Sequence, residues 1–411
     1  MTSNCRFCAS PLHQTFADLG MSPISNAFIK ADQANQGEKF YPLHAYVCDR
    51  CLLVQLEEFE TPSEIFNEEY AYFSSYSSSW LTHCQNYVAA VIDRFHLDSQ
   101  SRVVEIASND GYLLQYFQER GLPVLGIEPA ANVAAVAQSQ GINSLVQFFS
   151  VATATQLVQA GQQADLLLGN NVLAHVPDLN DFVAGMKILL APGGVITMEF
   201  PHLLNLIQQN QFDTIYHEHF SYFSLLAVEK IFAQHGLTLF DVEQLPTHGG
   251  SLRIYGRHQQ EGERPISANI DRLKLAERAA GLDKMATYSN FAQQIEVTKR
   301  QLLSFLIAAQ ERGQQVVGYG APAKGNTLLN YCGVKTDLLS YTVDASPHKQ
   351  NMLLPGTRIP VYAPQHILET KPDYVLILPW NIQAEIMDSM QQIRAWGGKF
   401  VVPIPHLTIL D

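Results

Sequence analysis

Short apolar segments alternate with helix-like segments in two separate stretches of this chain, and this alternation constrains the fold more than any other feature. In the first stretch, we expect strands and helices at 102–107, 112–120, 123–127, 164–168, 182–190 and 195–199. In the second, we expect them at 316–320, 323–331, 338–343, 373–377 and 399–402. Strands that alternate with helices form parallel sheets covered by helices. We therefore predict an α/β protein with two such domains, joined by a helical connector at 268–312.

The composition supports packed domains and argues against two classes of partner. Hydrophobic residues make up 47% of the 411 residues and charged residues 16%, which provides apolar material for several cores. The net charge of −13 is unusual for a nucleic-acid-binding protein, which normally carries a basic face. No apolar run approaches the roughly 18 residues of a membrane-spanning helix, and the N-terminus has no apolar signal core. We expect a soluble cytoplasmic protein that binds neither nucleic acid nor membranes.

Two C-x-x-C pairs lie near the N-terminus, Cys5 with Cys8 and Cys48 with Cys51. Each pair can direct two thiolates at one metal ion, and two pairs complete the tetrahedral sulfur site of a zinc ribbon. A redox dithiol, the alternative, requires only one pair. The spacing favours one zinc ion, and four thiolates leave that ion no open position, so its role would be structural. We place this zinc-binding module at 1–65.

The turn after the first central strand, at 107–111, lacks the glycine pattern of a dinucleotide site. Its small residues would let the backbone approach a ligand, and Glu128 after the second strand can accept hydrogen bonds from both hydroxyls of a ribose. These features fit S-adenosylmethionine (SAM) better than NAD, with a solvated strand end as the alternative for Glu128. The carboxyl ends of neighbouring strands meet at the crevice where ligands bind. The candidate SAM residues are Glu105, Ala107, Asn109, Gly111, Glu128, Asn170 and Asn171.

A dense polar cluster lies within 212–223, where Tyr216, His217, Glu218 and His219 are consecutive. Histidines at i and i+2 share a face only in a strand, and no third ligand is evident nearby, so acid–base chemistry is favoured over a metal site. A histidine can remove a proton near neutral pH, Glu218 can orient it, and Tyr216 can hydrogen-bond a developing oxyanion. The alternative is an exposed polar loop.

Two glycine-rich segments are candidates for binding a substrate. The first, 247–253, would present backbone amides and Arg253, or would form an ordinary hairpin turn. The second, 318–330, places a glycine-rich turn before a helix, which directs amides at a phosphate while Lys324 adds a charge. Its Lys-Gly order differs from a Walker P-loop and favours a nucleoside diphosphate, with a tight packing turn as the alternative. The candidate substrate residues are His175, His202, His248, Ser251, Arg253, Tyr319, Gly320, Lys324, Asn326 and Asp344.

Several motifs occur here in the order found in one family. They are the two cysteine pairs, Tyr-Ala-Tyr-Phe-Ser-Ser at 70–75, Tyr-His-Glu-His-Phe at 216–220, His-Gly-Gly-Ser-Leu-Arg at 248–253 and Gly-Tyr-Gly-Ala-Pro-Ala-Lys-Gly-Asn at 318–326. Over essentially its whole length the chain resembles the sugar C-methyltransferases of deoxysugar biosynthesis, the C-3 methyltransferases of nucleotide-linked 4-keto sugars. The Leu-Ala-Pro-Gly-Gly-Val segment at 190–195 also looks like a class I methyltransferase.

The resemblance implies a monomer with three domains. These are the zinc module at 1–65, a SAM-binding class I methyltransferase domain with a Rossmann-like fold at 66–267, and, after the connector at 268–312, a second Rossmann-like α/β domain at 313–411. The C-terminal domain would bind the nucleotide of a dTDP-sugar.

The resemblance also implies a role for each residue of the polar cluster. His219 would be the base that forms an enolate beside a ketone, Tyr216 and Glu218 would support it, and either Tyr70 or Tyr72 would reach the sugar. Other classes remain as alternatives: a zinc-ribbon RNA methyltransferase, an NAD-dependent dehydrogenase that uses the C-terminal domain, and a non-catalytic protein that binds sugar nucleotides.

Overall fold

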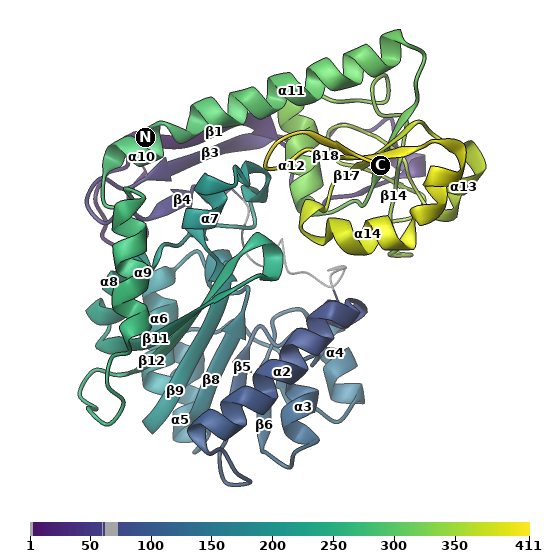
Figure 1. Cartoon of the computed structure of the whole chain (residues 1–411). Coiled ribbons are helices and arrows are strands. Elements are labelled where there is room, and N and C mark those ends of the chain that lie inside the picture. Colours follow the sequence, from purple (N-terminus) through teal and green to yellow (C-terminus); the bar gives the residue numbers. More distant parts are fainter. Residues whose placement is uncertain (1–2, 60, 62–72) are drawn as a thin grey trace.

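The computed structural model describes residues 3–59, 61 and 73–411 (Figure 1). In this described part of the chain, a seven-stranded sheet lies in the central region, a four-stranded sheet in the N-terminal region and a six-stranded sheet in the C-terminal region. Tyr70 and Tyr72, the tyrosines expected to reach a substrate, lie outside the described residues. Among the residues described, no helix combines the length and the apolar character needed to cross a membrane.

The central sheet has the strand order β11-β12-β9-β8-β5-β6-β7. Its strands are β5 (Val103–Ile106), β6 (Val124–Ile127), β7 (Ser144–Leu145), β8 (Ala164–Asn170), β9 (Leu190–Pro201), β11 (Leu237–Leu245) and β12 (Ser251–His258). The pairs among β5, β6, β7, β8 and β9 are parallel, whereas β12 is antiparallel to both β9 and β11. The predicted parallel sheet is confirmed, with one antiparallel hairpin added at its edge.

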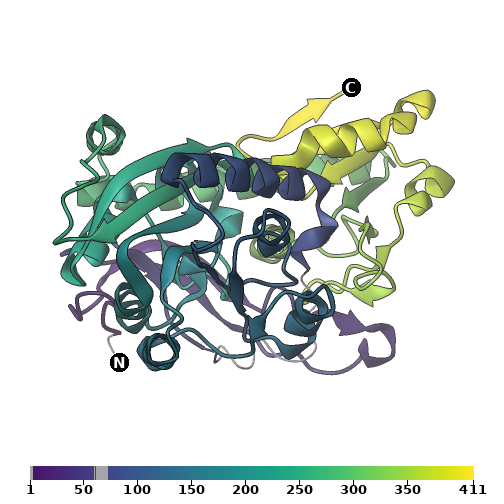
Figure 2. The same cartoon turned by 90° about the horizontal axis from the view of Figure 1, so that it is seen from below.

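Helices cover both faces of the central sheet. They are α2 (Ser78–Phe95), α3 (Leu114–Gln118), α4 (Ala131–Ser139), α5 (Val151–Gln159), α6 (Leu179–Leu189) and α8 (Leu225–Gln234). Successive strand residues point to opposite faces, so Val103 shares a hydrophobic cluster with α2 and α3, and Val104 shares one with α5, α6 and α8. Figure 2 shows the helices on the two sides of this sheet. The helix expected at 112–120 is shorter, because the turn at its start continues to Leu113.

The N-terminal sheet is antiparallel, in the order β1-β3-β4-β10. Its strands are β1 (Gln14–Ser22), β3 (Tyr41–Val47), β4 (Val54–Leu56) and β10 (Ser221–Tyr222). Strand β10 follows the polar cluster at 216–219 directly, and it pairs with Val54 and Gln55 of β4. The predicted module at 1–65 is therefore completed by a strand from far along the chain, and this pairing fixes the polar cluster against it.

The C-terminal sheet has the order β16-β14-β13-β17-β18-β19, in which β19 is antiparallel to β18 and the other pairs are parallel. Its strands are β13 (Val316–Tyr319), β14 (Thr342–Val343), β16 (Val361–Tyr362), β17 (Tyr374–Ile377), β18 (Lys399–Val402) and β19 (Thr408–Leu410), and its helices are α12 (Ala323–Cys332), α13 (Gln365–Thr370) and α14 (Gln383–Ser389). The strand expected at 338–343 is reduced to β14, because residues 336–338 form a turn and 339–341 are irregular. Strand β15 (Met352–Leu353) pairs with β2 (Ile29–Lys30) and joins this region to the N-terminal one.

The connector consists of α9 (Ala268–Ala279), α10 (Met285–Ser289) and α11 (Phe291–Glu311). Helix α11 extends along the N-terminal sheet to the C-terminal region (Figure 1). Phe16 of β1 stacks on Phe291 with ring centroids 4.7 Å apart, and both belong to one hydrophobic cluster with Leu302 and with Val317 of β13. The N-terminal and C-terminal regions therefore share a core.

Candidate active site

A cavity of about 710 Å³ extends from the carboxyl ends of the central parallel strands to the start of α12. This volume lies in the range of small-molecule sites. The cavity wall includes the predicted residues Ala107, Asn109, Glu128, Asn170, Asn171, His175, Tyr216, Glu218, His219, His248 and Lys324. The structure thus brings most of the cofactor candidates, the polar cluster and Lys324 together around one space.

Glu128 and the turn after β5 form one end of the cavity. The two oxygens of Glu128 accept hydrogen bonds from the backbone amides of Ala130 (2.9 Å) and Asn109 (3.0 Å). Burial raises the pKa of Glu128 because desolvation disfavours a carboxylate, and these two bonds oppose the shift. Ala107 and Asn109 have φ angles of 57° and 49°, which turn the backbone sharply at the cavity. The remaining lone pairs of Glu128 leave it able to accept hydrogen bonds from a ribose, so this end fits SAM.

Glu105 and Gly111, two other SAM candidates, lie behind the cavity wall. Glu105 is fully buried, and desolvation raises its pKa well above the ordinary value. Gly111 has a φ of 80°, and a Cβ atom there would lie 2.4 Å from the side chain of Ile142. Packing and backbone conformation explain why residue 111 is a glycine. Neither Glu105 nor Gly111 lines the described cavity, so any influence of these two residues on a ligand would be indirect.

His219 lies in the loop before β10 and is buried in the cavity wall. Its Nδ1 is 2.9 Å from the carbonyl oxygen of Thr214, and its Nε2 is 2.8 Å from Tyr216 Oη. A carbonyl oxygen only accepts, so Nδ1 carries the proton, and Nε2 accepts from the tyrosine hydroxyl. Desolvation, with the nearby His175 as a smaller cause, holds the pKa of His219 well below its ordinary value. The ring is therefore neutral at pH 7, with its basic nitrogen beside Tyr216.

His217 points to a different part of the molecule. Its Nε2 lies 3.2 Å from the carbonyl oxygen of Pro42 in β3, and it is outside the cavity wall. The chain at 217–218 forms a turn, so the side chains of His217 and His219 do not share a strand face. Among the described residues, the four N-terminal cysteines alone form a group of three or more potential metal ligands. Within the described residues, the polar cluster is therefore not a group of this kind.

Lys324, near the start of α12, brings a cation to the cavity wall. Its Nζ donates to Asn381 Oδ1 at 2.7 Å and lies 4.7 Å from the centre of the Trp380 ring. Burial lowers the pKa of Lys324, and the negative charge of Asp213 opposes this shift. Burial raises the pKa of Asp213 to about 7, although Lys324 and a 2.7 Å hydrogen bond from Trp380 Nε1 lower it. Asp213 is therefore only partly ionised near pH 7 and neutralises Lys324 incompletely, which suits a binding site for an anion.

The other candidates of this region, Tyr319, Gly320, Asn326 and Asp344, are outside the described cavity wall. The Nδ2 atom of Asn326 donates to the carbonyl oxygen of Ser25 at 2.7 Å, and Asp344 accepts from the amide of Ala321 at 2.7 Å. Gly320 has a φ of 88°. The contacts of Asn326 and Asp344 hold the turn and α12 in place, and a direct contact of these four candidates with the substrate stays a prediction.

Cys5, Cys8, Cys48 and Cys51 bring their sulfur atoms within 4.8 Å of one another. The Sγ atoms of Cys5 and Cys51 are 3.6 Å apart, and those of Cys8 and Cys48 are 3.5 Å apart. Four thiolates at zinc–sulfur distances of about 2.3 Å in a tetrahedron lie at comparable separations. The donor set and its spacing therefore fit one zinc ion with no open position.

Family models match the chain in succession. They are "Putative zinc binding domain" at 5–66, "Methyltransferase domain" at 80–242 and "C-methyltransferase C-terminal domain" at 246–405. The C-methyltransferase NovU of Streptomyces niveus is 33% identical to this chain over 407 residues, which cover 99% of this chain and 96% of NovU. The chain belongs to the C-methyltransferase family. The predicted family is confirmed, as is the class I methyltransferase fold with a second α/β region and an N-terminal cysteine cluster.

Other known proteins match smaller shares of the chain. A ubiquinone biosynthesis O-methyltransferase of Rhizobium etli (strain CIAT 652) is 29% identical over 96 residues, which are 23% of this chain and 39% of that protein. Magnesium protoporphyrin IX methyltransferase (ChlM) of Synechocystis PCC 6803, solved with bound SAH, is 15% identical with a TM-score of 0.34, over 43% of this chain and 82% of that one. The PH0226 protein of Pyrococcus horikoshii OT3 is 13% identical with a TM-score of 0.36, over 49% of this chain and 99% of that one.

The segment at 247–250 of the C-methyltransferase is the turn of the β11–β12 hairpin, in which Leu245 pairs with Ser251. This turn also carries His248 into the cavity wall, where its Nε2 lies 2.9 Å from Asn171 Nδ2. His248 has a φ of 54°, a conformation that is rarely adopted by residues other than glycine. Burial lowers the pKa of His248 to about 4, so its ring is neutral at pH 7. The hairpin alternative is therefore correct, and the hairpin itself contributes to the site.

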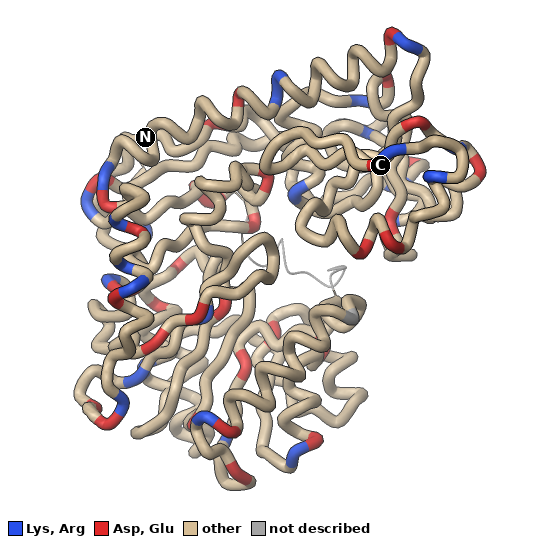
Figure 3. Tube along the Cα trace, viewed as in Figure 1, with Lys and Arg blue, Asp and Glu red and all other residues tan. Residues whose placement is uncertain are grey.

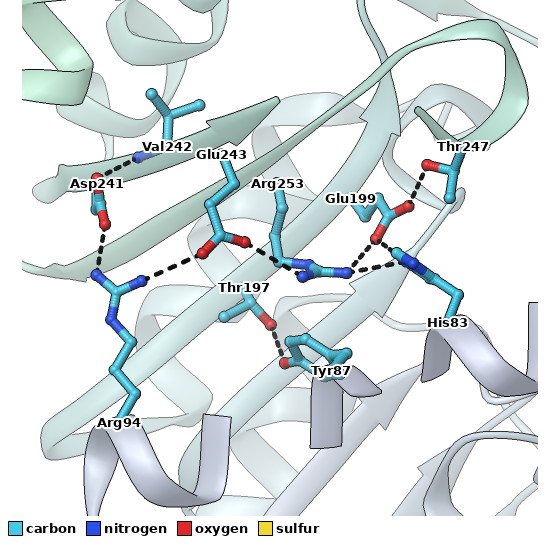
Figure 4. A network of polar contacts seen from close by, with 10 residues as sticks. All are labelled: His83, Tyr87, Arg94, Thr197, Glu199, Asp241, Val242, Glu243, Thr247 and Arg253. Carbon is cyan, nitrogen blue, oxygen red and sulfur yellow. Dashed lines mark hydrogen bonds and ion pairs between the residues drawn. The ribbon is translucent and has the colours of Figure 1, made fainter. Parts of the chain in front are cut away.

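Arg253 of the C-methyltransferase belongs to a polar network beneath this turn (Figure 4). Glu199 accepts hydrogen bonds from Arg253 Nη2 (2.6 Å), His83 Nε2 (2.9 Å) and Thr247 Oγ1 (2.8 Å). Burial alone would raise the pKa of Glu199, but His83 and the charge of Arg253 hold it at about 2. Arg253 also pairs with Glu243 at 3.3 Å. Arg253 is outside the described cavity wall, where an ion-pair network between the sheet and α2 holds its guanidinium, and its contact with a substrate stays a prediction.

Two further substrate candidates have structural partners. The Nε2 atom of His202 lies 2.7 Å from Glu277 Oε1, and both side chains are buried. Ser251 Oγ donates to the carbonyl oxygen of Thr247 at 3.1 Å. Both candidates lie outside the described cavity wall of the C-methyltransferase, and their contact with a substrate stays a prediction.

Replacing Thr247 by valine is expected to loosen the hairpin turn and leave the charges of the network unchanged. Valine has a similar shape but cannot donate to Glu199, so the turn that carries His248 loses a contact that fixes it at the cavity wall. A hydrogen bond to a charged group contributes about 1.5–3 kcal/mol, so steady-state kinetics should show KM for the methyl acceptor raised roughly tenfold or more. Thr197→Val is the matched control, because Thr197 contacts Tyr87 at 2.6 Å in the same network. Equal KM values for both variants would contradict this role of Thr247.

Several cavity residues of the C-methyltransferase were not predicted from the sequence. They are Asn26, Trp80, Phe148, Phe149 and Lys349, among others. Phe148 and Phe149 are adjacent aromatic residues in a segment that follows a strand, a pattern that could have indicated a ligand pocket. Asn26 gives no such signal, because it is a single amide in a loop that precedes the polar cluster by nearly half the chain.

Proposed function

We propose that this C-methyltransferase transfers a methyl group from SAM to C-3 of a dTDP-linked 4-keto deoxysugar, next to the ketone. The observation that carries the proposal is that His219, neutral and with a basic ring nitrogen, lies in the same cavity wall as Glu128 and Lys324. One cavity therefore offers a base, an acceptor for a ribose and a cation for a diphosphate.

The hydrogen on a carbon next to a ketone is acidic enough for an enzymatic base. His219 Nε2 takes this proton, and the electron pair of the C–H bond moves to form the enolate. The carbonyl of Thr214 holds the Nδ1–H and stabilises the imidazolium that results. Tyr216, which donates to Nε2 before the substrate arrives, is placed to donate to the enolate oxygen. SAM, when bound, supplies the electrophilic methyl group, which leaves sulfur as the new carbon–carbon bond forms.

The pH dependence of methyl transfer follows from the environment of His219. The base acts only in its unprotonated form, and the pKa of His219 is well below its ordinary value. We therefore expect a rate that stays constant from about pH 8 down past 6.5, the ordinary pKa of histidine, and that falls only in more acidic solution. A pH–rate profile measures this directly, and a rate that halves near pH 6.5 would contradict the depressed pKa.

Incubation with SAM and a panel of dTDP- and GDP-linked 4-keto sugars tests the proposed substrate. Mass spectrometry should show one methyl group added to a dTDP-linked 4-keto sugar and none to the matched sugar with a 4-hydroxyl. Separate titrations with NAD and dTDP test the two alternative classes. Consumption of NAD would favour the dehydrogenase, and binding of dTDP without methylation would favour the non-catalytic binding protein. Lys and Arg are interspersed with Asp and Glu along the described chain, which argues against an RNA substrate (Figure 3).

Replacing Lys324 by alanine is expected to weaken binding of dTDP and leave binding of SAM unchanged. The buried ammonium group supplies the charge for a diphosphate at the cavity wall, and its loss should raise the dissociation constant of dTDP roughly tenfold or more. Lys335, an exposed lysine of the same region, provides the control as Lys335→Ala. Calorimetry that finds equal dTDP affinity in the two variants would remove Lys324 from the nucleotide site.

A further inference from the structure

Asn26 contacts the carboxylate of Glu218 directly. Its Nδ2 atom lies 2.8 Å from Oε1 and 2.9 Å from Oε2 of Glu218, although the two residues are 192 positions apart. Both line the cavity, where Asn26 is exposed and Glu218 is 4% exposed. A buried carboxylate requires hydrogen-bond donors, and donors to a charged acceptor form stronger bonds than neutral pairs do. Asn26 therefore supplies an N–H donor to the acidic residue that precedes His219.

The N-terminal sheet positions both partners of this contact. Asn26 follows β1, and Glu218 precedes β10, which is a strand of the same sheet. Each partner of the contact is therefore tied to a strand of this sheet. The sheet that contains β1 and β10 sets the distance between the amide and the carboxylate.

The C-terminal region holds the same segment from its other side. Asn326 of α12 donates to the carbonyl oxygen of Ser25, the residue before Asn26, at 2.7 Å. Strand β2, shortly after Asn26, pairs with β15. Glu38 accepts a hydrogen bond from the amide of Gly356 at 2.7 Å and pairs with Arg358 at 3.2 Å. The position of Asn26 is thus fixed by contacts with two other regions of the chain.

We propose that Asn26 is a positioning residue for methyl transfer, which holds the Glu218 carboxylate at the cavity wall beside His219. The inference rests on the proposed function and on the expectation from the sequence that Glu218 supports His219. It assigns the cysteine-bearing module a part in the reaction, because that module supplies a side chain to the site.

The test compares Asn26→Ala and Asn26→Asp with Asn35→Ala, a matched control at an exposed asparagine of the same module. Asn26→Ala should lower kcat roughly tenfold or more, by loss of a bond to a charged group, with KM for SAM unchanged. Asn26→Asp places two carboxylates in contact. The decrease in kcat should therefore be larger at pH 8 than at pH 6, where a proton shared by the two carboxylates removes their repulsion. His175, His219 and Lys349 are ionisable and also line this cavity. The rate of each variant is therefore divided by the wild-type rate at the same pH.

The outcomes separate this inference from the proposed function. A wild-type enzyme that methylates the sugar, with Asn26 variants that match Asn35→Ala, would overturn the positioning role. If the wild type methylates no 4-keto sugar, the proposed function fails, and crystal structures of the wild type and Asn26→Ala then decide the inference. A Glu218 carboxylate that leaves the cavity wall in Asn26→Ala supports it, and an unmoved carboxylate overturns it.

Discussion

His219→Asn is expected to abolish both methyl transfer and exchange of the acceptor's hydrogen with solvent, while SAM and the sugar nucleotide still bind. Asparagine fills much of the same space and can keep a hydrogen bond to Thr214, but it has no basic nitrogen to take a proton. Removal of a general base typically costs 10²–10⁴-fold in rate. The measurement uses a 4-keto sugar nucleotide and an unreactive SAM analogue in deuterated water, where the wild type should introduce deuterium at the carbon that becomes methylated.

His217→Asn is the matched control, because its ring faces Pro42 and is outside the cavity wall. It should exchange deuterium at nearly the wild-type rate. Normal exchange in His219→Asn would place the base elsewhere, and Tyr216 would then be the first candidate. Exchange that survives while methylation stops would instead indicate that His219 positions the methyl donor.

Cys48→Ser is expected to remove zinc and to destabilise the N-terminal sheet. Structural zinc sites contribute on the order of 10 kcal/mol or more to folding, and a serine hydroxyl is a poor replacement for a thiolate. Metal analysis should show zinc well below one ion per chain, and thermal unfolding should begin at a lower temperature than in the wild type. Because Asn26 and β10 both depend on this sheet, methyl transfer should decline with the metal content.

Cys84→Ser provides the control for the zinc assignment. Cys84 is a buried free thiol of α2 outside the cysteine cluster, so its replacement should leave zinc content unchanged even if it lowers stability. Full zinc occupancy in Cys48→Ser would contradict the four-thiolate site.

The regular part of the fold was predictable because its signals are local. The buried run at 103–106 and the strands after it follow from their own apolar residues, and the convergence of parallel strands placed Glu128 and Asn170 at one crevice. Strand β10 was not predictable, because two residues carry no pattern of their own and become a strand only by pairing with β4.

The side-chain directions within the site were less predictable than its location. Arg253 and Lys324 both lie in glycine-rich segments that suggest ligand binding, yet Arg253 pairs with Glu199 inside the sheet and Lys324 lines the cavity. The difference depends on which side chain lies within hydrogen-bonding distance, Glu199 for Arg253 and Asn381 for Lys324, and residue type and spacing do not reveal this. Asn26 illustrates the same limit, since its partner Glu218 is far away in the sequence.

The position of β10 in the N-terminal sheet has a consequence for biosynthesis. The four cysteines and the first strands of that sheet leave the ribosome early, but the strand that completes the sheet is residues 221 and 222. At synthesis rates of about 5–20 residues per second, the module waits for many seconds with the edge of β4 unpaired. Exposed strand edges promote aggregation, so the edge of β4 is open to pairing with other chains until residues 221 and 222 have been made.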